Sequence, residues 1–146
     1  MTGLLIPIRG FTPHAIAAVR YALEFGKRNN ARLHFLFVAD SAIEPGVSGL
    51  EDRPGKEKGL HPLQAEIEAL INAGKSSEGV QIEVHFRSGD FIQEVRQYVR
   101  THYITEIVIS LPEECEETFE QIGKDIQLLL KMTHCRILTV KQKNKE

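Results

Sequence analysis

Residues 3–39, GLLIPIRGFTPHAIAAVRYALEFGKRNNARLHFLFVA, decide the fold of this chain. The runs at 3–8 and 33–39 are continuously apolar, which is typical of strands that are buried on both faces of a parallel sheet. Between them, Thr12-Pro13 has the form of an N-cap followed by a proline at the first helical position. Apolar residues then recur at helical spacing until Arg28-Asn29-Asn30. A strand, a helix and a second strand in this order predict a parallel sheet.

The same alternation of apolar strands and amphipathic helices continues along the rest of the chain. Strands are predicted at 80–86, 104–110 and 135–140, and a helix precedes each of them. The segment 80–86 is apolar on one face and polar on the other, which indicates an edge strand. Five strands and four helices predict one doubly wound α/β domain over residues 1–146. Within it, the glycine- and proline-rich segment 41–61 is expected to be a flexible loop, and residues 142–146 a polar tail.

The composition argues against several classes of partner. The 146 residues include 18 Lys and Arg and 20 Asp and Glu, so the net charge of −2 gives no general attraction to nucleic acid or to an anionic membrane. No apolar stretch approaches the roughly 20 residues of a membrane-spanning helix, and the N-terminus lacks a signal-peptide pattern. Two cysteines are too few for a disulfide framework. We therefore expect a cytoplasmic protein with no nucleic-acid partner and no membrane insertion.

Patterns that resemble catalytic or ligand motifs are incomplete. Residues 69–76, ALINAGKS, match a relaxed phosphate-loop pattern but fall at the end of a predicted helix, so Gly74 is expected to be a C′ residue. The six histidines show no metal-ligand spacing and are expected to be surface or hydrogen-bonded structural residues. Glutamates 113, 114 and 117 offer carboxylates suited to Mg²⁺ or Ca²⁺, yet the helix dipole alone favours acidic residues in a first turn. The sequence thus predicts no catalytic residue and no metal.

Several stretches, in this order and spacing, resemble the universal stress protein family along nearly the whole chain. They are IPIRG with PHAIAAVRYALEFGKR, then ARLHFLFVAD, then FRSGDFIQEVRQYVRTHYITEIVIS, and finally THCRILTVK. The resemblance implies a three-layer α/β fold in which a five-stranded parallel sheet of order 3-2-1-4-5 carries helices on both faces.

The family resemblance also implies where a nucleotide would bind. One branch of the family binds ATP through G-x2-G-x9-G-[ST] after the fourth strand, together with an Asp at the end of the first strand. Placed without gaps, the motif falls on Ser110, Glu113, Gly123 and Lys124, of which only Gly123 matches, and Arg9 stands where the Asp would be. The chain therefore resembles the branch that lacks the motif. We expect a degenerate nucleotide cleft at Arg9, Gly10, Val38, Ser110, Glu113, Gly123 and Lys124.

Electrostatics support the loss of ATP binding. Glutamates gather after the predicted strand 104–110, in the stretch LPEECEETFE at 111–120. One carboxylate about 5 Å from one phosphate charge costs roughly 3 kcal/mol at an effective dielectric constant near 20. We expect no cofactor, and we hypothesise that Arg9 pairs with Glu113 or Glu114. The alternatives are that Arg9 points to water or recruits a different anion.

The leading functional hypothesis is a stress-associated regulatory and interaction module that is not an enzyme and does not bind ATP. The resemblance implies a homodimer through the last strand, at Arg136, Ile137, Leu138, Thr139 and Val140. The alternative is a monomer, in which the charge of Lys141 just beyond blocks strand pairing. The protein partner is unknown, and a transporter is one candidate, because similar domains in the family occur fused or adjacent to transporters. The alternative function is a nucleotide-binding, weakly ATP-hydrolysing protein that uses altered contacts.

Overall fold

The computed structural model describes residues 3–10, 12–39, 62–76, 80–112 and 117–141. Its elements are, in chain order, β1 (Gly3–Ile8), α1 (Pro13–Asn29), β2 (Arg32–Ala39), α3 (Pro62–Lys75), β3 (Gln81–Ser88), α4 (Phe91–Thr101), β4 (Glu106–Leu111), α5 (Glu117–Met132) and β5 (Arg136–Lys141). The expected loop at 41–61 and the expected tail at 142–146 lie outside the described residues.

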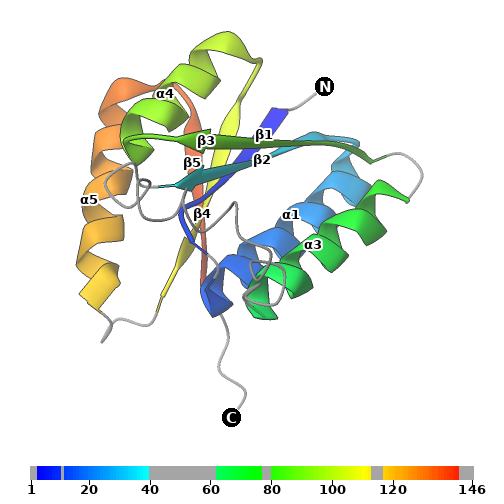
Figure 1. Cartoon of the computed structure of the whole chain (residues 1–146). Coiled ribbons are helices and arrows are strands. Elements are labelled where there is room, and N and C mark those ends of the chain that lie inside the picture. Colours follow the sequence, from blue (N-terminus) through cyan, green and yellow to red (C-terminus); the bar gives the residue numbers. More distant parts are fainter. Residues whose placement is uncertain (1–2, 11, 40–61, 77–79, 113–116, 142–146) are drawn as a thin grey trace.

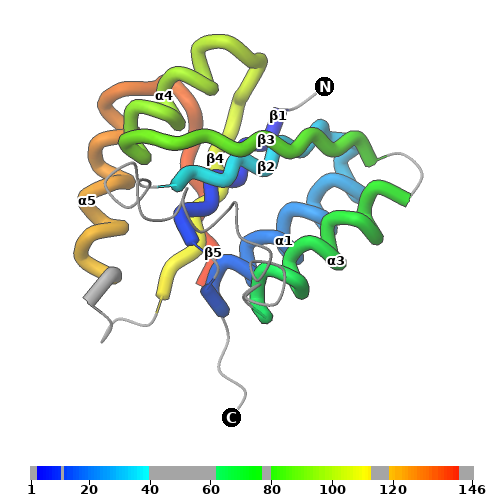
Figure 2. The backbone as a smooth tube through the Cα atoms, viewed as in Figure 1, coloured from blue at the N-terminus to red at the C-terminus, as the bar shows by residue number. Residues whose placement is uncertain are grey.

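The strands form one parallel sheet of order β3-β2-β1-β4-β5, which confirms the predicted fold class. Helices α1 and α3 cover one face of the sheet, and α4 and α5 cover the other (Figure 1). The strand predicted at 80–86 is β3, and it lies at an edge as expected. The other edge is β5, at the far end of the strand order (Figure 2).

Two apolar clusters, one on each face of the sheet, form the core. All six residues of β1 are buried, because this central strand has helices above and below it and a strand on each side. Leu4, Ile6 and Ile8 join the cluster under α1 and α3, whereas Leu5 joins the cluster under α4 and α5. Helices cover β1 on both faces of the sheet, which explains why its sequence is continuously apolar.

N-capping side chains determine where α1 and α4, the two helices that begin beside the site, start. The Thr12 hydroxyl oxygen accepts a hydrogen bond from the Ala15 amide at 3.2 Å and starts α1, as predicted. Asp90 caps α4 in the same way, accepting from the Gln93 amide at 3.0 Å. Both caps hold the N-terminus of a helix beside the carboxyl ends of the strands.

Gly74 does not have the predicted role. It lies inside α3, which continues to Lys75, and it is buried. A Cβ atom placed on Gly74 would lie 2.5 Å from Leu23 Cδ2 of α1 and 3.1 Å from Ile82 Cδ1 of β3. The prediction of a C′ glycine was therefore wrong: this glycine allows α3 to pack closely against α1 and the sheet.

Candidate functional site

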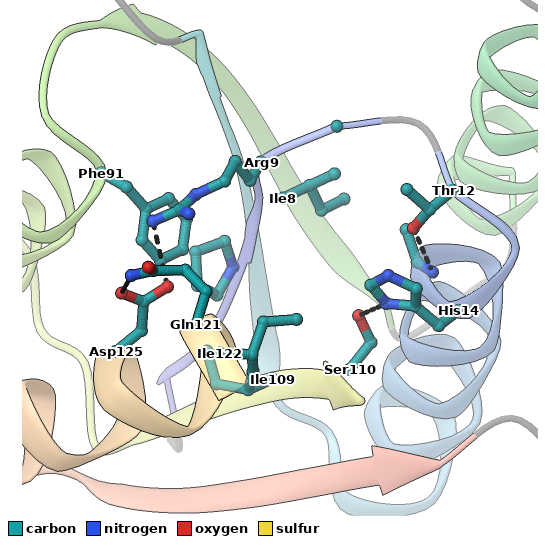
Figure 3. A pocket seen from close by; sticks show the side chains of 13 residues that line it. Ile8, Arg9, Thr12, His14, Phe91, Ile109, Ser110, Gln121, Ile122 and Asp125 are labelled. Atoms are coloured by element: carbon teal, nitrogen blue, oxygen red, sulfur yellow. Dashed lines mark hydrogen bonds and ion pairs between the residues drawn. The ribbon is translucent and has the colours of Figure 1, made fainter. Parts of the chain in front are cut away.

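The candidate site lies at the carboxyl ends of β1 and β4, where the strand order reverses direction. In open α/β sheets this crevice is the usual position for a ligand. Here it contains a cavity of about 200 Å³, lined by the ends of β1 and β4, the start of α1, Phe91 at the start of α4, and α5. The side chains form two polar groups on opposite walls, with apolar residues between them (Figure 3).

The first polar group is an ion pair between Arg9 and Asp125. Arg9 directly follows β1, and its Nη2 atom lies 3.0 Å from Oδ2 of Asp125 on α5. The guanidinium carbon lies 4.4 Å from the centroid of the Phe91 ring, a cation–π distance. The pair therefore links the end of the central strand to α5, with the Phe91 ring of α4 against the guanidinium.

Asp125 is the more constrained partner of this pair. Its side chain is 5% exposed, whereas that of Arg9 is 45% exposed. The second carboxylate oxygen, Oδ1, accepts a hydrogen bond from the side-chain Nε2 of Gln121 at 3.1 Å. Burial raises the pKa of the Asp125 carboxyl above its ordinary value, and Arg9 and Gln121 oppose that shift. Arg9 and Gln121 thus offset the desolvation cost of a buried carboxylate.

The second polar group joins His14 to Ser110. His14 is in the first turn of α1 and Ser110 is in the last part of β4, and their Nδ1 and Oγ atoms are 2.8 Å apart. A hydroxyl and an imidazole together offer both a donor and an acceptor to a ligand. Between the two polar groups, Ile8, Ile109 and Ile122 make the cavity wall apolar.

The residues predicted to form a degenerate nucleotide cleft do not all lie together in the structure. Arg9, Gly10 and Ser110 line the cavity. Val38 is buried in the core cluster under α4 and α5. Gly123 and Lys124 are exposed inside α5, beyond its first turn. Glu113 lies outside the described residues.

The partner hypothesised for Arg9, Glu113 or Glu114, also lies outside the described residues. The alternative that Arg9 only points to water was wrong, because its guanidinium pairs with Asp125. Sequence reasoning missed Asp125. The available signal was a carboxylate placed on the apolar stripe of α5, between Ile122 and Ile126.

Three of the six histidines lie close together, although their spacing in the sequence shows no ligand pattern. His34 of β2, His85 of β3 and His102 at the end of α4 gather around the Tyr98 ring, with ring centroids 3.8–5.5 Å from it. Their separation along the chain hides this arrangement, because three different elements bring them together.

The residues predicted for a dimer interface form β5, at the edge of the sheet. Arg136 and Thr139 are exposed, and Ile137, Leu138 and Val140 are half-buried. Half-buried apolar residues are the expected result where a strand has a neighbour on one side only. Within the described residues, no helix has the length and apolar character that crossing a membrane requires.

Comparison with known proteins gives a family and a fold. The model of the universal stress protein family matches residues 3–112. No curated protein matches the chain. Universal stress protein UspA from Lactobacillus plantarum has a similar structure, with a TM-score of 0.70 and 18% identity over 95% of this chain and 97% of that one.

Two further similar structures were solved with nucleotides. A universal stress protein in complex with cAMP has a TM-score of 0.64 and 11% identity, over 96% of each chain. The universal stress protein from Archaeoglobus fulgidus in complex with dAMP has a TM-score of 0.61 and 12% identity, over 97% of this chain and 98% of that one. At these identities the likeness shows the fold alone, and it is the family match over residues 3–112 that assigns the chain. The sequence match, the strand order and the cavity at the crossover agree, and the chain belongs to the universal stress protein family.

Proposed function

We propose that this chain is a stress-associated regulatory module that acts through protein contacts in the cytoplasm and does not hold ATP. One observation carries the proposal: β4 ends at Leu111 and α5 begins at Glu117, so only residues 112–116 connect them. Their sequence is PEECE, which has three carboxylates and no glycine. A phosphate-binding connection needs backbone N–H groups that a phosphate can approach closely, and glycine makes that approach possible.

The position of Gly123 supports the same conclusion. In the ungapped placement, Gly123 and Lys124 stand for the last two positions of the ATP motif. Here they are exposed residues within α5, so they are not part of a connection that could surround a phosphate. The family match also ends at Pro112, immediately before the acidic residues.

The cavity is small for ATP. Its volume of about 200 Å³ is below the roughly 300–1,000 Å³ of pockets that bury drug-sized ligands. The Arg9–Asp125 pair lies on its wall, and a triphosphate that recruited Arg9 would leave the buried carboxylate without its cation. Removing one partner of a buried pair is costly, since the remaining charge stays desolvated.

Protein contacts are proposed to begin with a homodimer through β5. The amide of Arg136 donates to the carbonyl of Thr105 at 3.2 Å, so the backbone groups of Arg136 point toward β4. Because successive residues of a strand alternate, those of Ile137 and Thr139 point to the outer edge. A second copy of β5 would pair with these groups and cover Ile137, Leu138 and Val140.

The test is a titration of purified protein with Mg-ATP, followed by the melting temperature and by calorimetry. A ligand at 100 times its Kd adds about 2.7 kcal/mol to the free energy of unfolding, which is readily measured. We expect no change. An upward shift that saturates with Mg-ATP would overturn the proposal, and release of phosphate over hours would add slow hydrolysis.

A second candidate function is binding of a nucleoside or nucleoside monophosphate of which only the base or the ribose enters the cavity. Its walls are largely apolar, and the His14–Ser110 pair offers hydrogen bonds to a base or a ribose hydroxyl. Related structures contain cAMP and dAMP. The same assay with cAMP and dAMP, repeated on Ser110→Ala, separates the candidates: a shift that the variant weakens supports binding in this cavity.

A further inference from the structure

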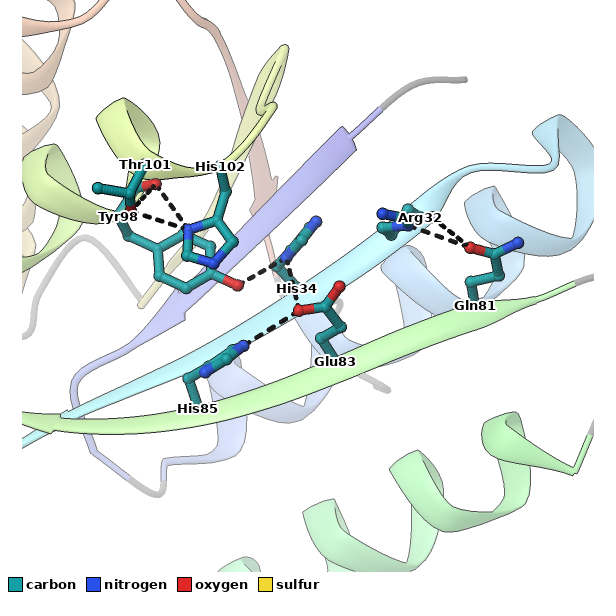
Figure 4. A network of polar contacts seen from close by, with 8 residues as sticks. All are labelled: Arg32, His34, Gln81, Glu83, His85, Tyr98, Thr101 and His102. Carbon is teal, nitrogen blue, oxygen red and sulfur yellow. Dashed lines mark hydrogen bonds and ion pairs between the residues drawn. The ribbon is translucent and has the colours of Figure 1, made fainter.

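A second cluster of ligand-type side chains lies on the face of the sheet that α4 covers, outside the cavity described above. It consists of Glu83 and His85 on β3 and His102 immediately after α4 (Figure 4). One potential ligand atom from each of the three residues lies within 4.8 Å of the other two. All three residues are partly exposed, so a solute can reach them.

The local structure explains why these three meet. Glu83 and His85 are two residues apart on a strand, so their side chains project from the same face. The parallel register places Glu83 beside His34 of β2. His102 is held over this face because its ring stacks on Tyr98, with ring centroids 3.8 Å apart and planes 7° apart.

Two of the potential ligand atoms already have a suitable separation. Glu83 Oε1 and His85 Nε2 are 3.2 Å apart in a hydrogen bond whose proton a metal ion would replace. Two ligands at about 2.0–2.1 Å from a tetrahedral Zn²⁺ are separated by about 3.3 Å. Because the three ligand atoms lie within 4.8 Å of one another, His102 can enter the same sphere by a movement of at most about 1.5 Å, which a partly exposed side chain makes by a small rotation.

A contact at Nδ1 orients the His102 ring so that its Nε2 can bind a metal ion. Its Nδ1 lies 3.1 Å from the carbonyl oxygen of Tyr98, which can only accept a hydrogen bond. In the tautomer with the proton on Nδ1, this nitrogen donates to the carbonyl, the Thr101 hydroxyl at 3.0 Å can also accept from it, and Nε2 keeps the lone pair that a metal needs. Metal-binding histidines are commonly oriented in this way, by a carbonyl on the nitrogen that does not bind the metal.

The surrounding charges are compatible with a cation. Arg32 donates to the side chain of Gln81 at 2.9 and 3.1 Å, and Arg87 pairs with Glu94 at 3.7 Å. The carboxylate of Glu83 instead contacts the imidazoles, with His34 Nδ1 at 3.9 Å in addition to His85. The buried His34 ring is itself held by the Tyr98 hydroxyl at 2.6 Å and supports the cluster from below.

We propose that Glu83, His85 and His102 form a binding site for a borderline transition-metal dication, with Zn²⁺ as the first choice. Two imidazoles and one carboxylate suit Zn²⁺, Co²⁺ or Ni²⁺, whereas Mg²⁺ and Ca²⁺ prefer sites made of oxygen alone. Three protein ligands leave at least one coordination position to water or to a ligand from a partner. Bound metal would join the edge strand β3 to the end of α4. The site is separate from the β1–β4 cavity and independent of the function proposed there.

The test is titration of tag-free, EDTA-stripped protein with Zn²⁺ by calorimetry and by competition with a chromophoric chelator. We expect one Zn²⁺ per chain, an increase in melting temperature, and no comparable effect of Mg²⁺. Co²⁺ in place of Zn²⁺ should give the intense visible bands of a tetrahedral or five-coordinate complex. Single variants Glu83→Gln, His85→Ala and His102→Ala should each weaken Zn²⁺ binding at least tenfold.

The matched control is His134→Ala, which removes an exposed histidine outside the cluster. This variant should bind Zn²⁺ as the original chain does. Circular dichroism and melting in EDTA verify that each variant is folded before its affinity is compared. Absence of Zn²⁺ binding, or binding that the three cluster variants leave unchanged, would overturn the proposal.

Discussion

At the scale of single residues, two buried ionisable groups determine how this protein responds to mutation and to pH. Asp125 lies in the wall of the β1–β4 cavity and His34 lies beneath the histidine cluster, and both residues are buried. Each is held by a specific contact, Asp125 by Arg9 and His34 by the hydroxyl of Tyr98. Asp125 is held by a charged partner and His34 by a neutral one, so mutation tests the first group and a change of pH tests the second.

Replacing Arg9 with Gln should destabilise the protein, because Asp125 loses the cation that offsets its desolvation. Since Gln121 still donates to the carboxylate, we expect a loss of about 1–2 kcal/mol in the free energy of unfolding. Adding Asp125→Asn to this variant should recover much of the loss. Urea unfolding at pH 7.5 measures both effects.

The control for that comparison is Arg20→Gln. Arg20 pairs with Glu66 at 3.4 Å, and both side chains are largely exposed. An exposed pair of this kind contributes about 0–1 kcal/mol. If both arginine variants lose the same free energy of unfolding, the Arg9–Asp125 pair contributes no more to stability than an exposed ion pair.

His34 should make the protein less stable in mild acid. Burial lowers its pKa from 6.5 to about 4, while Glu83 raises it and His102, Arg32 and His85 lower it further. Between these two values the unfolded chain binds a proton that the folded chain excludes. Stability is therefore full near pH 7 and declines as the pH falls from 6.5 to 4, by up to roughly 3 kcal/mol.

Urea unfolding from pH 4.5 to 7 in the presence of EDTA measures this dependence. A His34→Gln variant keeps a polar side chain beside Tyr98 but does not titrate, so its stability should vary less over the same range. If both proteins show the same slope, a different group is responsible for the acid sensitivity.

At the scale of helices and strands, the sequence predicts most of the fold but little of the site. Continuous apolar runs and helix caps are local signals, and β1, β2 and α1 follow from them. Asp125 and the histidine cluster were missed, because their partners come from elements far apart in the chain. The role of Gly74 was missed for the same reason: only the packing of α3 against α1 reveals it.

Replacing Gly123 with Ala should stabilise the protein, because alanine has the higher helix propensity and its Cβ would have room. Gly123 is inside α5, and a Cβ atom placed on it meets no atom within 4 Å. The change should add about 0.5–1 kcal/mol through helix propensity and raise the melting temperature by about 1–4 °C. Differential scanning calorimetry measures the shift.

Gly74→Ala is the matched control, since it makes the same chemical change in another helix. Its Cβ atom would overlap the side chain of Leu23, so this variant should melt at a lower temperature. A decrease for Gly123→Ala would contradict the prediction, because it would show that a side chain at position 123 causes strain.

At the scale of the whole molecule, the sheet has two edge strands, β3 and β5. The β3 edge carries Glu83 and His85 on one face of the sheet, and half-buried Ile82 and Val84 with exposed Phe86 on the other. The β5 edge carries half-buried Ile137, Leu138 and Val140 together with exposed Arg136 and Lys141. Charged and metal-binding side chains discourage strand pairing, and apolar ones favour it. Both edges carry both kinds of side chain, so the proposed dimer through β5 needs a direct test.

Thr139→Pro should convert the proposed dimer to a monomer. The backbone of Thr139 points away from β4, so proline would remove an N–H from the outer edge and leave pairing with β4 intact. Size-exclusion chromatography with light scattering gives the mass, and circular dichroism verifies the fold. Thr139→Val keeps the N–H and should remain dimeric. A Thr139→Pro protein that is still dimeric would place the interface elsewhere.

The strand order 3-2-1-4-5 also has a consequence for synthesis on the ribosome. The three strands β1, β2 and β3 are adjacent in both sequence and space, so they can pair while the second half of the chain is still being made. During that time the apolar central strand has an uncovered side, which is closed only when residues 106–111 emerge. A nascent chain that stalls between Ser88 and Glu106 therefore presents its most apolar strand to other chains, and chaperone protection would be needed most in that interval.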